Sequence, residues 1–176
     1  MANRPQRWIL FCAAIVSLLL VTGFSSLLRE ADEITTASVL REMNRFRKAR
    51  GLNPFIPDSR LERAASDRME DMEELGYWAH RSPDGRSPFV WLPVRGYQFR
   101  AAGENLATGF ETAKLLVSSW MESKGHRDNI LSTDFSGVGI AIIEGSSTGR
   151  AAGKSVVVIF AAEMVEQIRR PARRRE

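Results

Sequence analysis

Residues 8–28 form a run without any charged side chain, and this run limits which part of the chain can fold as a water-soluble domain. As a helix rising 1.5 Å per residue it would span roughly 30 Å, the thickness of the hydrocarbon core of a bilayer. Arg4 and Arg7 precede the run and acidic residues follow it, so the positive-inside rule places the rest of the chain outside the cytoplasm. We predict that residues 1–29 are a signal anchor that holds the protein in the membrane through residues 8–28. The alternative is a cleaved signal peptide, which would leave the domain secreted.

The charge of the chain is concentrated at its two ends. The net charge is +4, but the C-terminal sequence RRPARRRE together with Arg4 and Arg7 carries more than this excess, so the body is mildly acidic. Nucleic-acid-binding domains present basic surfaces, and we therefore predict no nucleic-acid partner, a monomer, and a basic disordered tail over residues 166–176. The single cysteine, Cys12, lies in the apolar run, which excludes an intrachain disulfide and a cysteine-based metal cluster.

The body of the chain reads as helices followed by a strand pair. Residues 35–50, the segment from Ser59 to Gly76 and residues 111–121 carry apolar side chains at helical spacing. We also expect a short helix over residues 87–92 and a strand over residues 97–106 that breaks at Gly103. The apolar runs GVGIAII and SVVVIFAA are joined by a polar, glycine-rich connection, which predicts a terminal hairpin. This order predicts one α+β domain over residues 35–165, with an antiparallel sheet covered by helices.

The chain has two histidines, and both stand next to turn-forming residues. His80 precedes the turn sequence SPDG, and His126 follows the expected end of a helix, four residues after Glu122. Glu104 lies in the sequence AGENLATG. Neutral imidazoles and carboxylates suit zinc or a similar divalent ion, and scaffolds usually present functional side chains from loops and element ends. From spacing alone, two interpretations stay open: a shared His/Glu site, or histidines that each hydrogen-bond a local turn.

Five sequence blocks occur in an order that resembles the CAP superfamily, which includes cysteine-rich secretory proteins, antigen 5 and plant pathogenesis-related proteins. The resemblance covers about residues 36–163 and is closest to the bacterial branch of the superfamily, which usually lacks disulfides. The blocks are NRFR…GLNP, HRSPDGRSPF, GENLA, WMESKGHRDNIL and GVGIA.

This resemblance implies an α-β-α sandwich with a central antiparallel sheet and an open cleft that gathers two histidines and two acidic residues. His80, Glu104 and His126 match three of these positions. The fourth position departs from the family, because Ser123 stands where disulfide-rich members have a glutamate, and Glu122 comes one residue earlier. The implied ligand groove contains His80, Glu104, Glu122 and His126. The implied metal, zinc or another divalent cation, is held by His80, His126 and Glu104.

Three hypotheses follow for the activity of this groove. The first is an exported binding module for a divalent ion and an amphipathic, lipid or cell-wall-derived ligand. The second is a hydrolase with a metal-bound water and Glu104 as the base. The third is a purely structural polar cluster. The sequence contains no G-x-S-x-G, no H-E-x-x-H and no candidate catalytic cysteine, so we favour a binding module over an enzyme.

Overall fold

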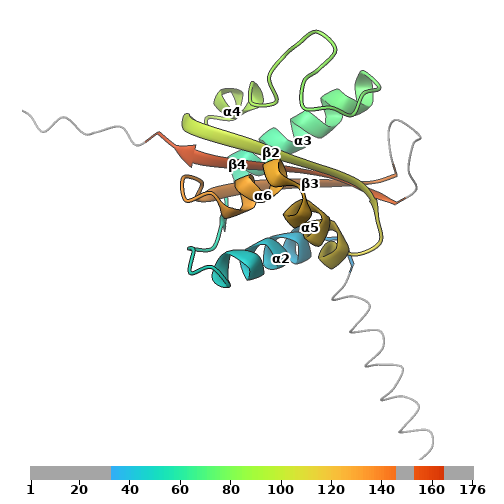
Figure 1. Ribbon diagram of the computed structural model, residues 1–176. Coiled ribbons are helices and arrows are strands. Elements are labelled where there is room, and N and C mark those ends of the chain that lie inside the picture. The colour runs from blue at the N-terminus through green and yellow to red at the C-terminus, as the bar shows by residue number, and fades with distance from the viewer. Residues whose placement is uncertain (1–32, 146–152, 165–176) are drawn as a thin grey trace, which may run out of the picture.

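The computed structural model describes residues 33–145 and 153–164, which form a four-stranded sheet with helices on both faces (Figure 1). The predicted segments 1–29 and 166–176 lie outside these residues. Within the described part of the chain, no helix is long and apolar enough to cross a membrane. In chain order the elements are α2 (Thr36–Lys48), β1 (Ile56–Pro57), α3 (Ser59–Glu74), α4 (Trp91–Val94), β2 (Phe99–Phe110), α5 (Ala113–Glu122), α6 (Lys124–Leu131), β3 (Gly137–Glu144) and β4 (Lys154–Glu163).

The sheet confirms the α+β class, but it is not wholly antiparallel and differs from the prediction in this respect. Its strand order is β1-β3-β4-β2, and β4 pairs antiparallel with both β3 and β2. The short edge strand β1 pairs parallel with β3. Pro57 has no N–H to donate, but the N–H groups of Ile56 and Asp58 bond to the carbonyls of Ser136 and Val138. A proline is therefore tolerated at this edge.

The central strand β4 is buried on both faces because helices cover both sides of the sheet. Its side chains alternate between two apolar clusters. Val156, Val158 and Phe160 pack with α2, α5 and α6, whereas Val157, Ile159 and Ala161 pack with α3 and α4. This two-sided burial explains why β4 reads as a continuous apolar run in the sequence.

Strand β3 presents small residues to α3 and large residues to the opposite cluster. Val138 and Ile140 belong to the cluster under α2. On the other face, Gly137 and Gly139 lie against α3 at Leu61. The GVGIA block therefore lets a helix lie unusually close to the sheet.

Three local predictions differ from the structure. Strand β2 continues through Gly103 without the predicted break, and residue 103 pairs in register with Phe160. The glycine leaves room for a side chain from α6, which packs where a Cβ would be. The short helix begins at Trp91, since residues 87–90 form a turn in which Val90 N–H bonds to the Ser87 carbonyl. The segment around His126, predicted to lie beyond a helix end, is itself helix α6.

Candidate functional site

The middle of β2 sends adjacent side chains to opposite faces of the sheet, as successive strand residues must. Glu104 pairs with Ile159 of the α3-side cluster, whereas Asn105 pairs with Val158 of the α6-side cluster. The Glu104 side chain therefore points to the layer that carries His80, and the Asn105 side chain points to the layer that carries His126. This part of β2 connects the two halves of the site.

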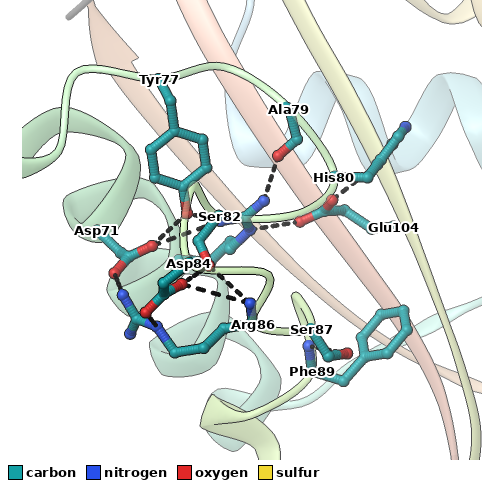
Figure 2. Close-up of polar contacts among 11 residues, drawn as sticks. Asp71, Tyr77, Ala79, His80, Ser82, Asp84, Arg86, Ser87, Phe89 and Glu104 are labelled. Carbon is teal, nitrogen blue, oxygen red and sulfur yellow. Dashed lines mark hydrogen bonds and ion pairs between the residues drawn. The ribbon is translucent and has the colours of Figure 1, made fainter.

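Glu104 links a helix of one layer to the loop that carries His80. Its side chain is only 2% exposed, and its two oxygens contact different side chains. Oε2 accepts from Arg68 Nε at 2.9 Å, and Oε1 lies 2.8 Å from His80 Nδ1 (Figure 2). Each carboxylate oxygen of Glu104 thus contacts a side chain of the protein itself.

The loop around His80 is tied to α3 by a network of polar contacts (Figure 2). Arg68 also donates to the Tyr77 hydroxyl and the Ala79 carbonyl, and the Tyr77 hydroxyl donates to Asp71. Asp71 in turn pairs with Arg86 at 2.9 Å. The imidazole of His80 is consequently held at a fixed place although its side chain is 56% exposed.

The backbone of His126 is held from the other side by the amide of Asn105, which is itself bonded to Asn129. Asn105 Nδ2 donates to the His126 carbonyl at 3.1 Å. Asn129 Nδ2 donates to the Asn105 side chain at 2.9 Å and to the Glu104 carbonyl at 3.1 Å. A Cβ on Gly103 would lie 2.5 Å from Asn129 Oδ1, so the glycine is what allows α6 to approach β2 this closely.

The far end of α6 is fixed by a buried arginine. Arg47 of α2 is 3% exposed and donates to the carbonyls of Ile130 and Ser132, each at 2.8 Å. A cation at a helix C-terminus also interacts favourably with the helix dipole. Arg47 therefore contributes to the position of His126 without approaching the groove.

These contacts bring the two imidazoles together over an open groove of about 580 Å³. The ring centroids of His80 and His126 are 6.1 Å apart, and that of Trp120 lies 6.3 Å from His126. The groove is lined by His80, Arg81, Ser87, Pro88, Phe89, Glu104, Ser123, Gly125, His126 and Asn129.

Three of the four residues predicted for the groove line it, and Glu122 does not. Glu122 is exposed at the end of α5 and lies outside the lining formed by the described residues. Ser123, at the position where the resemblance implies a glutamate in disulfide-rich members, does line the groove. Among residues 33–145 and 153–164, no group of three or more His, Cys, Asp or Glu side chains is arranged to hold a metal ion.

Sequence reasoning missed Arg68 and Asn129, which position the site. Arg68 lies on the apolar stripe of α3, between Ala65 and Met72, and is completely buried. A charged residue on such a stripe needs a buried partner, so this position could have been recognised. Asn129 carries no comparable signal.

The environments of the two histidines shift their pKa values in opposite directions. The hydrogen bond to the Glu104 carboxylate raises the pKa of His80. Burial, followed by the nearby charge of His80, lowers the pKa of His126. His126 is therefore the ring that stays neutral more readily as the pH falls, and a neutral ring nitrogen can act as a metal ligand or hydrogen-bond acceptor.

Two curated bacterial proteins are similar to this chain in sequence. The uncharacterized protein YkwD of Bacillus subtilis is 37% identical over 109 residues, which cover 62% of this chain and 42% of YkwD. The uncharacterized membrane protein YlbC of the same organism is 30% identical over 104 residues, covering 59% of this chain and 30% of YlbC. The chain thus spans less than half the length of either relative.

A solved structure and a family model agree with the architecture described above. An outer surface protein from Borrelia burgdorferi superimposes with a TM-score of 0.62 at 23% identity, covering 75% of this chain and 98% of that protein. This likeness concerns the fold. Residues 40–161 match the cysteine-rich secretory protein family, CAP. The chain therefore belongs to the CAP family, as its five sequence blocks predicted.

Proposed function

We propose that the chain is an extracytoplasmic binding module whose groove holds a divalent ion between His80 and His126 and an amphipathic ligand beside it. The observation that carries the proposal is the convergence of the chain's two histidines, with ring centroids 6.1 Å apart, on one open groove. Zinc–nitrogen bonds of about 2 Å allow two imidazoles at such a separation to share an ion.

The donor set defines what kind of metal site this would be. Because both oxygens of Glu104 accept hydrogen bonds from Arg68 and His80, we assign this carboxylate to orienting His80 and leave the two imidazoles as the protein ligands. Metal-ligating histidines commonly donate their second ring N–H to a carboxylate in this way. A bound divalent ion would supply Lewis-acid attraction for an oxygen of the ligand.

The walls of the groove fit an amphipathic ligand. Pro88 and Phe89 form an apolar wall, and Phe89 is braced edge-on by Phe99 at a centroid distance of 6.1 Å. Ser123 and Asn129 line the groove with polar groups. A lipid or a fragment of a cell-wall polymer carries this combination of apolar and polar surface, and we propose this ligand class.

The same geometry disfavours the hydrolase hypothesis. A general base needs a free acceptor within hydrogen-bond reach of the attacking water. Glu104 is the candidate base, but its side chain is only 2% exposed, so an attacking water would have little access to the lone pairs that remain on its two oxygens. Binding rather than catalysis is therefore the function that we propose.

The extracytoplasmic position also belongs to the proposal. It is supported by the uncharged run of residues 8–28 with arginines before it. One sequence relative is named as a membrane protein, and a protein of similar fold is named as an outer surface protein.

Zinc titration of the full chain tests the metal site. His80→Ala and His126→Ala should each weaken zinc binding at least tenfold, or by about 1.4 kcal/mol, because each removes one imidazole. Wild-type affinity should fall with falling pH, since only neutral imidazole binds metal. The fall should begin above the ordinary histidine pKa of about 6.5, because Glu104 raises the pKa of His80. Equal zinc affinity in wild type and both histidine variants would exclude the site.

Ser123→Glu should strengthen zinc binding about tenfold or more. Ser123 lines the groove, so a carboxylate there would become a third ligand. Within the described chain the Ser123 side chain makes no capping hydrogen bond to α6, so little stability is lost on replacing it. Calorimetric titration at constant pH measures the effect.

Two neighbouring variants control for charge. Lys124→Glu makes the local charge more negative at a residue that does not itself line the groove, and Glu122→Ala removes the exposed carboxylate on the other side of Ser123. Both should leave zinc affinity within about threefold of wild type, a difference of less than about 1 kcal/mol. An increase in Lys124→Glu as large as in Ser123→Glu would mean that general electrostatics, not ligation, is at work.

A further inference from the structure

Arg68 is the most deeply buried charged side chain near the groove, although it does not line it. It is 0% exposed and lies on the face of α3 that packs against the sheet. We propose that Arg68 is a positioning residue that acts through Glu104 to fix the proton of neutral His80 on Nδ1, so that Nε2 faces the groove as an unprotonated nitrogen.

The guanidinium group of Arg68 donates hydrogen bonds and cannot accept them. It uses three nitrogens: Nε donates to Glu104 Oε2 at 2.9 Å, and the others donate to the Tyr77 hydroxyl and the Ala79 carbonyl. These contacts hold the guanidinium from three sides. Whatever atom of residue 104 faces Arg68 must therefore be an oxygen.

The other oxygen of Glu104 faces His80. Oε1 lies 2.8 Å from His80 Nδ1, and a carboxylate only accepts hydrogen bonds. His80 Nδ1 must then carry the hydrogen. A neutral imidazole has a single N–H, so Nε2 keeps its lone pair, and Figure 2 shows this second nitrogen on the side of the ring away from Glu104.

Only the predicted effect on zinc affinity rests on the proposed function, because Nε2 is the His80 atom that would bind the ion. The tautomer itself can be measured without metal. The chain has two histidines, so long-range proton–nitrogen NMR of the full chain resolves both rings, measured at a pH above the observed titration of each ring. In the wild type, His80 should carry its proton on Nδ1.

Glu104→Gln is the decisive variant. Arg68 will orient the amide with its oxygen toward the guanidinium, so the amide nitrogen faces His80 and donates to Nδ1. The proton of His80 should then move to Nε2, and zinc affinity should fall at least tenfold. The tautomer of His126 should stay as in the wild type and serves as the internal control.

The double variant Arg68→Met/Glu104→Gln isolates the contribution of Arg68. Both partners are neutral, so no buried charge is stranded and the chain keeps its fold. Without the guanidinium the amide is free to turn its oxygen toward His80, and a substantial Nδ1–H population should return. If Glu104→Gln leaves the proton on Nδ1, or if the double variant matches the single one, the inference is wrong.

Metal binding separates this inference from the proposed function. If the His80 proton moves to Nε2 in Glu104→Gln but the wild type does not bind zinc, the role of Arg68 is supported and the metal site is excluded. If zinc binding needs both histidines but the His80 proton stays on Nδ1 in Glu104→Gln, the metal site is supported and the role of Arg68 is wrong.

Discussion

Gly139→Ala should destabilise the protein more than any other single methyl addition in the described sheet. A Cβ at this position would overlap the backbone of α3 at Leu61 and Glu62. Backbone atoms cannot rotate away as a side-chain end can, so α3 would have to separate from β3, the strand it covers. We expect the free energy of unfolding to fall by more than about 3 kcal/mol, above the usual range for an overpacked core. Urea unfolding monitored by circular dichroism measures this change.

Gly125→Ala is the matched control, since it adds the same methyl group to a helix. Beyond its chain neighbours and the backbone of α6 itself, no described atom lies within 4 Å of a Cβ built on Gly125, and its φ is not in the left-handed region. Alanine at this position of α6 should be neutral or should stabilise by up to about 1 kcal/mol through helix propensity. Similar unfolding midpoints for the two variants would show that the close approach of α3 to β3 is not a requirement of the fold.

Arg68→Met is the second large effect that we expect. The substitution keeps an apolar chain of similar length on α3 but leaves the Glu104 carboxylate buried without its cationic partner. Removing one member of a buried ion pair typically costs about 3–5 kcal/mol. Chemical unfolding of the full chain at neutral pH should show a loss in this range.

Two further variants show whether the stranded charge is the cause. Arg68→Met/Glu104→Gln should recover a large part of the loss, because no carboxylate remains to be desolvated. Asp67 lies on α3, as Arg68 does, and forms a more exposed ion pair with Arg95. Arg95→Met breaks this pair and should lower the free energy of unfolding by at most about 1 kcal/mol. A double variant no more stable than Arg68→Met would contradict this explanation.

The longer helices α2, α3 and α5 and the central strands β3 and β4 were predictable because each has a simple hydrophobic pattern. The apolar stripe of α3 and the continuous apolar run of β4 follow directly from one-sided and two-sided burial. Sequence alone could not show that β1 joins the sheet. A strand of two residues, Ile56 and Pro57, carries no recognisable period, and its pairing with β3 is a contact between distant segments.

The candidate site was predictable in its residue types more than in its contacts. His80, Glu104 and His126 were found from residue chemistry and family order, and they line one groove. Helix α6 was missed because Ser123 and Gly125 read as the end of a helix, whereas Ser123 is the junction between two helices. That junction turns Glu122 outward and brings Ser123 to the groove, a result that depends on where one helix stops.

X-ray absorption at the zinc edge tests the proposed metal site most directly, because it reports the atoms bonded to the ion. For the zinc-loaded wild-type chain we predict two imidazole nitrogens at about 2.0–2.1 Å, with oxygen ligands completing the coordination shell. His80→Ala and His126→Ala should each lose one imidazole contribution. A zinc shell without imidazole scattering, or one that is the same in wild type and both variants, would contradict the account of a groove built around two histidines.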